Sequence, residues 1–185
     1  MKELALNILD IAKNSVKAGA TLTEISIIEK DETLELIFKD DGCGMTEETV
    51  RTVIDPFYTT RTTRKVGLGI PLLKLAAEQT GGHLSISSKV ADENDASSGT
   101  VVSALFFKNH LDFTPLGDVA SSIITLIHGN PDTDFLFVHD SPNGECRLDT
   151  RELREVLEDV PLNNYEVLEW IKGSLEEQYE IINQK

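Results

Sequence analysis

Residues 10–20 read Asp10-Ile-Ala-Lys-Asn14-Ser-Val-Lys17-Ala-Gly-Ala20, and three shorter motifs follow along the 185-residue chain. These motifs are Asp40-Asp-Gly-Cys-Gly-Met45, Gly67-Leu-Gly-Ile70 and Ser98-Gly-Thr100. Any one of them alone is weak evidence, because two glycines near an aspartate occur in many loops. Their order and their combined chemistry predict a single pocket that binds a nucleotide.

Residues 2–18 are expected to form an amphipathic helix, because apolar side chains recur there at helical spacing. Asn7, Asp10, Asn14 and Lys17 recur at steps of three and four, which places them in one polar stripe. Such a stripe is often only a solvated face. Its chemistry favours a binding role here, because an amide oxygen and a carboxylate suit Mg²⁺ and a lysine suits phosphate oxygens.

The second motif follows an expected strand over residues 34–38, so Asp40 is held at a strand end. A carboxylate there can accept a hydrogen bond from the amino group of adenine, while Gly42 and Gly44 let the backbone turn and let a ligand approach. The alternative is a simple Asp-Gly turn. Thr46 is expected to cap the helix that comes next.

The third motif opens an expected helix that stops at Gly81, and the N-terminus of such a helix favours phosphate. Three cations, Arg61, Arg64 and Lys65, precede this motif in a chain of net charge -15. Beside a triphosphate they have an obvious role. Thr100 begins an expected strand over residues 100–107, where its hydroxyl can also meet phosphate.

Taken together, the motifs resemble those of the GHKL ATPases, which include histidine-kinase catalytic domains, MutL-type mismatch-repair ATPases, topoisomerase ATPase domains and a heat-shock chaperone. Residues 10–21 are similar to the MutL-type first box, and residues 55–88 are similar to the bacterial sensor-kinase version. The resemblance covers residues 2–107. It implies ATP and Mg²⁺ as cofactors and the Bergerat fold, an α+β two-layer sandwich in which helices cover a mixed sheet.

By that resemblance Asn14 should hold Mg²⁺, Lys17 should contact phosphate, Asp40 should read adenine and residues 61–66 should form a lid. The other expected nucleotide-binding residues are Gly42, Gly44, Met45, Phe57, Thr60, Lys65, Gly67, Leu68, Gly69, Ile70 and Thr100. The candidate catalytic residues are Asp10 as a base, together with Lys17, Arg61 and Arg64.

Two departures from the family pattern concern reactivity. Asp10 stands where the hydrolysing members carry a Glu, and its side chain is one methylene shorter. That difference bears on water activation, because a general base must reach hydrogen-bond distance of the proton it takes. Asp41 stands where the family usually has Asn, and the lid is short, which favours fast nucleotide exchange.

Composition and charge suggest a cytoplasmic protein of two parts. The sequence has no apolar run near 18 residues and no leader, and Cys43 and Cys146 lack metal-ligand spacing, so reduced thiols are expected. Residues 1–110 hold 12 basic and 16 acidic residues, whereas residues 111–185 hold 5 and 16. We expect an ATPase-like domain over 1–110 and a small acidic α+β appendage over 111–185.

The appendage is expected to contain a helix over residues 115–128, strands over 134–138 and 146–149 joined by a hairpin turn, and two final helices. Thr150 and Asn164 are expected to cap those two helices. The acidic surface argues against nucleic acid and anionic membrane, and favours an unidentified protein partner. A homodimer is possible.

Three functional classes fit the sequence: a kinase that acts in trans on a His or Ser/Thr of a partner, an ATP-driven switch with slow hydrolysis, and an ATP or ADP sensor without turnover. The histidine hairpin of a complete sensor kinase is not expected, because nothing precedes the first motif. His139-Asp140 is similar to the acceptor dipeptide of such kinases. It ends an expected strand, however, so a structural or surface histidine is the interpretation there.

Overall fold

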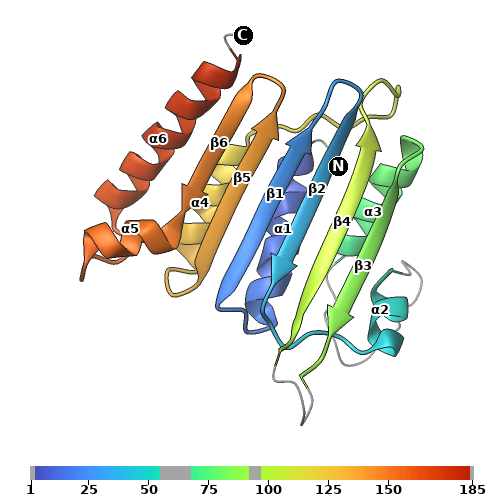
Figure 1. Ribbon diagram of the computed structural model, residues 1–185, viewed down its shortest axis with the longest axis horizontal. Coiled ribbons are helices and arrows are strands. Elements are labelled where there is room, and N and C mark those ends of the chain that lie inside the picture. The colour runs from blue at the N-terminus through green and yellow to red at the C-terminus, as the bar shows by residue number, and fades with distance from the viewer. Residues whose placement is uncertain (1–2, 55–67, 92–96, 184–185) are drawn as a thin grey trace.

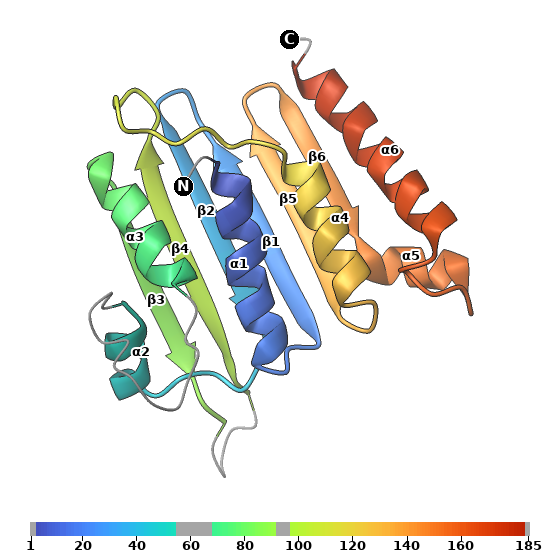
Figure 2. The same ribbon diagram turned by 180° about the vertical axis from the view of Figure 1, so that it is seen from behind.

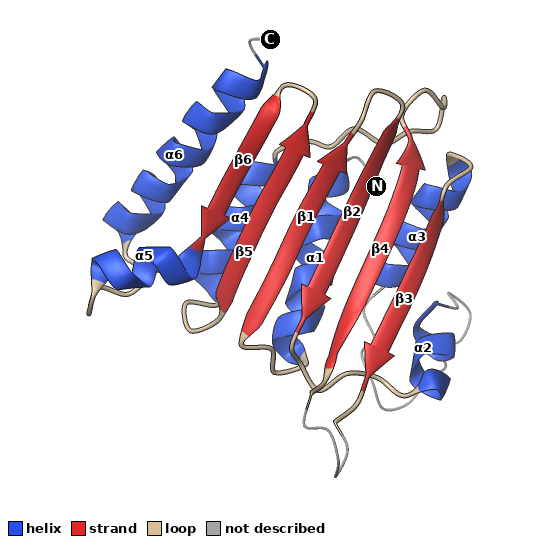
Figure 3. Ribbon diagram, viewed as in Figure 1, coloured by secondary structure: helices blue, strands red, loops and turns tan. Residues whose placement is uncertain are grey.

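The computed structural model of the chain describes residues 3–54, 68–91 and 97–183. Its centre is a six-stranded sheet of order β3-β4-β2-β1-β5-β6, and α1, α3 and α4 lie on one face of it (Figures 1 and 2). In the described part of the chain the opposite face carries no helix (Figure 3). The elements are α1 (Leu4–Lys17), β1 (Leu22–Glu29), β2 (Thr33–Asp40), α2 (Glu47–Ile54), α3 (Gly69–Gln79), β3 (His83–Lys89), β4 (Gly99–Phe107), α4 (Val119–Gly129), β5 (Asp134–Ser141), β6 (Gly144–Asp149), α5 (Thr150–Leu157) and α6 (Tyr165–Asn183).

The sheet is mixed, and its covered face forms the core. β1 pairs parallel with β5, whereas the other neighbouring strands pair antiparallel. Burial alternates along β1, β2 and β5, because successive side chains of a strand point to opposite faces. Among the largest fully buried side chains are Phe38, Phe106, Phe135 and Phe137. The expected α+β two-layer sandwich is therefore confirmed.

The C-terminal elements continue the same sheet and core. β5 follows β1 in register from Leu22 opposite Asp134 to Ile28 opposite Asp140. In space the two parts of the chain share one sheet and one cluster of buried side chains. The division of the chain into two domains at residue 110 stays a prediction.

The first turn of α1 is bonded to the segment that leads into α4. The Leu4 and Ala5 N–H groups donate to the carbonyl oxygens of Pro115 and Leu116 at 2.9 and 2.8 Å. These bonds satisfy two of the donors that every helix leaves free at its N-terminus. The sequence-predicted helix over 115–128 therefore begins late, at Val119, and is capped by the Asp118 carboxylate on the Ser121 N–H.

Helix caps are the second place where prediction and structure differ. The prediction of Thr150 as a cap is wrong: the Asp149 carboxylate caps α5 by accepting from the Arg151 N–H at 3.0 Å. The Thr150 hydroxyl is used inside the sheet, where it accepts from the Phe135 N–H at 2.8 Å. The Asn164 cap is confirmed, because its side chain accepts from the Glu166 N–H at 2.9 Å.

None of the helices formed by the described residues has the length and apolar character that a membrane span requires.

His139 is a buried structural residue that joins three elements. Its Nδ1 lies 3.1 Å from the Tyr179 hydroxyl of α6, and its Nε2 lies 3.2 Å from a carboxylate oxygen of Glu29 on β1. Glu29 also accepts from Lys108 at 2.6 Å. Burial lowers the pKa of His139, and the hydrogen bond and charge of Glu29 raise it only in part, so it lies below its ordinary value.

We expect the stability of the fold to decrease as the pH falls from 7.5 to about 5.5. The unfolded chain binds the His139 proton more readily than the folded one, so stability is present above the ordinary histidine pKa and is lost below it. Urea unfolding at the two pH values measures this effect. His139→Gln should weaken the dependence and His128→Gln, at an exposed site on α4, should not. Equal dependence in both variants would contradict this assignment.

Candidate functional site

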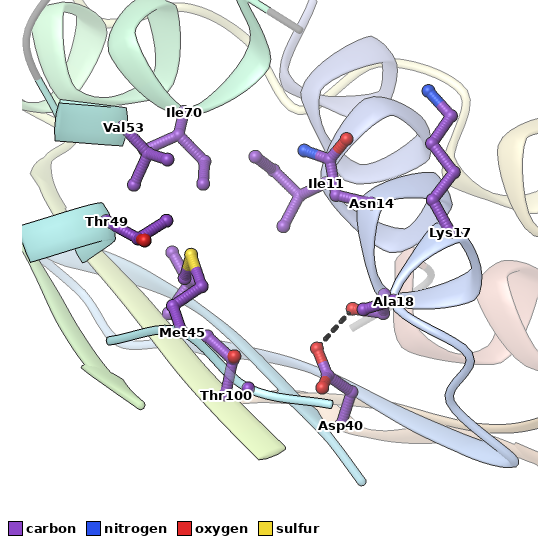
Figure 4. A pocket seen from close by; sticks show the side chains of 13 residues that line it. Ile11, Asn14, Lys17, Ala18, Asp40, Met45, Thr49, Val53, Ile70 and Thr100 are labelled. Carbon is purple, nitrogen blue, oxygen red and sulfur yellow. Dashed lines mark hydrogen bonds between the residues drawn. The ribbon is translucent and has the colours of Figure 1, made fainter. Parts of the chain in front are cut away.

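A cavity of about 310 Å³ opens between α1, α2, the start of α3 and neighbouring ends of β2 and β4 (Figure 4). The first helix supplies one wall, and the segment after β2 supplies the opposite one. The side chains and backbone that line it are those of Ile11, Asn14, Ser15, Lys17, Ala18, Asp40, Gly44, Met45, Thr49, Val53, Ile70, Thr100 and Val102.

Asp40 is fixed in one orientation at the end of β2. The Ser15 hydroxyl donates to one carboxylate oxygen at 2.6 Å, and the Gly42 N–H donates to the other at 3.0 Å. A Cβ at Gly42 would lie 2.9 Å from the Ala18 Cβ, so only glycine lets the loop pass this close to α1. Each carboxylate oxygen can accept a further hydrogen bond, which leaves Asp40 able to bind a donor in the cavity.

The loop after Asp40 is pinned to β3 and β4. Gly44 has a φ of +70°, and a Cβ there would lie 1.9 Å from the Lys89 carbonyl oxygen. The Met45 N–H donates to the Ser88 hydroxyl at 2.8 Å, and that hydroxyl lies 2.7 Å from the Thr100 hydroxyl. The Met45 backbone is therefore held to the two neighbouring strands, and Met45 lines the cavity.

Asn14 and Lys17 line the cavity with unused polar groups. Neither side chain makes a hydrogen bond or ion pair with another residue that the structure describes, so both are available to a ligand. Asp10 lies one turn earlier on α1, is exposed and does not line the cavity. Helix α3 begins directly beside it, since a Cβ at Gly69 would lie 3.3 Å from the Asp10 Cβ.

Asp41, the residue after Asp40, does not line the cavity and secures the start of β1. It accepts from the Thr21 and Leu22 N–H groups at 2.7 and 2.9 Å, and from the Thr21 hydroxyl. Partial burial raises the pKa of the Asp41 carboxyl, but these hydrogen bonds outweigh that effect and place it below its ordinary value. This carboxylate therefore holds the turn after α1 against the end of β2.

The structure brings part of the expected set together. The expected residues that line the cavity are Asn14, Lys17, Asp40, Gly44, Met45, Ile70 and Thr100. The expected residues that lie beside it without lining it are Asp10, Gly42, Leu68 and Gly69. The expected residues outside the described part are Phe57, Thr60, Arg61, Arg64, Lys65 and Gly67. The roles of all of them stay predictions.

Sequence reasoning missed the apolar and small residues of the cavity wall. These are Ile11, Ser15, Ala18, Thr49, Val53 and Val102. Thr49 and Val53 are four residues apart on α2, so helical spacing after the glycine loop could have placed them on one face. Ser15 directly follows Asn14 and gave no separate signal.

The oxygen atoms that line the cavity fit a Mg²⁺ ion whose other ligands come from phosphate groups. No cluster of three or more His, Cys, Asp or Glu side chains is present among the residues described. The free amide oxygen of Asn14 suits Mg²⁺, an ion that keeps waters and takes few protein ligands when phosphate oxygens supply the others.

The model of the family described as "Histidine kinase-, DNA gyrase B-, and HSP90-like ATPase" matches residues 2–110. Sporulation kinase E of Bacillus subtilis is 31% identical over 93 residues, which are 48% of this chain and 12% of that protein. The tetrathionate sensor histidine kinase TtrS of Salmonella typhimurium is 31% identical over 97 residues, 52% of this chain and 16% of that protein. The match thus spans less than a fifth of either curated relative.

Among solved structures, the MutL ATPase domain of Aquifex aeolicus complexed with ADP is similar in fold. The TM-score is 0.51 at 14% identity, and the match covers 100% of this chain and 98% of that one. At this identity the likeness shows the fold alone. The resemblance expected from the sequence motifs is confirmed by these comparisons.

Proposed function

The chain belongs to the histidine kinase-, DNA gyrase B- and HSP90-like ATPase family, and we propose that it binds Mg-ATP in the cavity and acts in trans as a regulatory protein kinase. The acceptor is a His or a Ser/Thr of an unidentified partner protein. The observation that carries the proposal is the gathering of Asn14, Lys17, Asp40 and Thr100 around one cavity.

The adenine ring fits the apolar part of the cavity. Met45, Ile70 and Val102 line it, and its volume of about 310 Å³ is near the lower end of ordinary small-molecule sites. Asp40, held by Ser15 and Gly42, then accepts a hydrogen bond from the adenine amino group. An unmatched donor or acceptor there costs about 1–3 kcal/mol, which selects adenine over bases without that amino group.

The phosphates extend from the adenine toward Asn14, Lys17 and the start of α3. The first N–H groups of that helix have no intrahelical partner and favour an anion. Arg61, Arg64 and Lys65 belong to this proposal as the lid, although they lie outside the described residues. Mg²⁺, when bound, neutralises charge between phosphate groups, and Asn14 supplies its ligand from the protein.

Asp10 is the proposed base. It is exposed, one helical turn from Asn14, so an acceptor side chain of another protein can reach it. The acceptor bonds to the γ-phosphorus, the bond from that phosphorus to the β–γ bridging oxygen breaks, and ADP leaves. Asp10 takes the proton that the acceptor loses, while Lys17, Arg61 and Arg64 stabilise the charge on the transferred group.

We expect Asn14→Ala to remove the Mg²⁺ dependence of ATP binding, because the variant lacks the proposed ligand from the protein. In the wild type, chelating Mg²⁺ should weaken ATP binding by about tenfold or more, whereas the variant should bind alike with and without the ion. Calorimetry with and without EDTA measures both. Asn14→Asp, which retains an oxygen ligand, is the matched control. An unchanged Mg²⁺ response in Asn14→Ala would place the metal elsewhere.

A second candidate, an ATP-dependent switch with slow hydrolysis, is favoured by the contacts of α1. This helix carries Asn14 and Lys17, packs against α4 and is bonded to residues 115–116. A nucleotide-dependent shift of α1 would therefore reach the C-terminal elements. The affinity for a partner, or for a second copy bound through those elements, would then depend on the nucleotide.

The test is incubation with Mg²⁺ and γ-labelled ATP, alone and with desalted lysate protein, while free phosphate and protein-bound label are followed together. Label on protein that requires Asp10 supports the kinase, and acid-labile or acid-stable label identifies a His or Ser/Thr acceptor. Steady phosphate release without label supports the switch. ATP binding with neither product supports a non-catalytic sensor and overturns the kinase.

A further inference from the structure

A second hollow lies far from the ATP cavity, where α5 meets the first turns of α6. Both helices lie at the β6 edge of the sheet, whereas α2 and α3 lie at the β3 edge (Figures 1 and 3). The groove has a volume of about 460 Å³. It is lined by Leu153, Val156, Leu157, Glu166, Val167 and Trp170.

The groove presents large apolar side chains to solvent. Val156 is 82% exposed and Trp170 is 61% exposed. Tyr165 and Val160, in the same short stretch of chain, are 75% and 45% exposed. Single exposed apolar residues are ordinary, but several gathered around a groove mark a site of interaction. Tryptophan is also one of the residue types that are enriched at the binding hot spots of protein interfaces.

The groove is formed by an acidic segment of chain, residues 150–170, whose carboxylates we call the acidic rim; Glu166 among them lines the groove itself. Residues 150–170 contain six acidic and two basic residues. Both basic residues are occupied, Arg151 by Asp149 at 2.7 Å and Arg154 by Asp134 at 2.7 Å. The acidic side chains without an ion pair in the described part of the chain are those of Glu155, Glu158, Asp159, Glu166 and Glu169.

We propose that this groove binds a basic amphipathic helix of a partner protein. Apolar side chains of that helix enter between Val156 and Trp170, and its lysines or arginines lie opposite the acidic rim. A second copy of this chain fits poorly, because its net charge of -15 opposes the rim. The inference does not depend on what happens to ATP, since the groove shares no residue with the ATP cavity.

Trp170 is the single tryptophan of the chain, so its fluorescence reports directly on the groove. The probe is an 18-residue peptide of leucine and lysine patterned as an amphipathic helix. One control peptide has the same composition in scrambled order, and another replaces lysine with glutamate. We expect only the patterned lysine peptide to shift the Trp170 emission to shorter wavelength and to protect it from iodide quenching.

Two charge-adding variants separate docking in the groove from general attraction to an acidic protein. Val156→Glu places a carboxylate in the groove, and Ile181→Glu makes the same change at a 63% exposed site near the end of α6. Both positions are exposed, so neither variant should disturb the core. Docking predicts that Val156→Glu weakens binding of the lysine peptide about tenfold or more and that Ile181→Glu does not.

Several outcomes would overturn the proposal. Equal or tighter binding by Val156→Glu would show attraction by net charge alone. Equal binding of the scrambled peptide would remove the helical requirement. If the Trp170 emission stayed unchanged over the whole range of peptide concentrations, the groove would not bind such a helix. Concentration-dependent dimerisation that Val156→Glu abolishes would assign the groove to a second copy instead.

Discussion

Asp10→Asn is expected to lower phosphoryl transfer or hydrolysis by about 100-fold or more while leaving ATP affinity within about twofold. The amide keeps the shape of the side chain but cannot take a proton at neutral pH. Affinity should persist because Asp10 does not line the cavity. Single-turnover assays with labelled ATP and calorimetry measure the two quantities separately.

Asp10→Glu is the conservative control, because it restores the longer carboxylate found in hydrolysing members of the family. It should retain turnover, or increase phosphate release if the short side chain limits water activation. If the Asp10→Asn variant turned over ATP at the rate of the wild type, Asp10 would have no part in the mechanism. A large loss of ATP affinity in that variant would show instead that Asp10 contributes to binding.

Gly99→Ala is expected to lower the free energy of unfolding by about 3 kcal/mol or more and to abolish ATP binding. Gly99 has a φ of +147°, a backbone angle that residues other than glycine rarely adopt. A Cβ there would lie 2.1 Å from the Asp40 carbonyl oxygen. The clash involves backbone, so β4 must move away from β2 at the position that aligns Asp40 with Thr100. Both residues line the cavity.

Gly173→Ala is the matched control for this prediction. A Cβ at Gly173 meets no atom within 4 Å, and the residue lies inside α6. Alanine there should be neutral or stabilising by up to about 1 kcal/mol, because it favours the helix. Urea unfolding of both variants gives the comparison. An equally small effect at both positions would contradict the close approach of β4 to β2.

Local patterns predicted the elements around the cavity well. Helical spacing in residues 2–18 and the glycines after Asp40 each constrain the backbone within a few residues. For this reason α1, β2 and α3 begin and end close to their predicted bounds. The Thr46 cap of α2 is also confirmed, since its hydroxyl accepts from the Thr49 N–H at 3.2 Å.

Features that depend on distant residues escaped prediction. Nothing local in residues 134–141 indicates that β5 pairs parallel with β1, more than 100 residues earlier in the chain. From the local sequence the Thr150 hydroxyl is predicted to cap a helix. In the fold it instead accepts a hydrogen bond from the Phe135 N–H of β5. The apolar cavity wall was missed for a similar reason: Val53 and Val102 resemble any core residue until the fold brings them to the same cavity.

In the proposed complex Asp40 accepts a hydrogen bond from the adenine amino group, and a comparison of ATP with inosine triphosphate tests this contact. Inosine triphosphate carries an oxygen in place of that amino group. Wild-type protein should bind ATP about tenfold or more tightly than the inosine nucleotide. Asp40→Asn, whose amide can donate to that oxygen, should lose or reverse the preference. An ATP preference that is equally strong in both proteins would contradict the placement of adenine in this cavity.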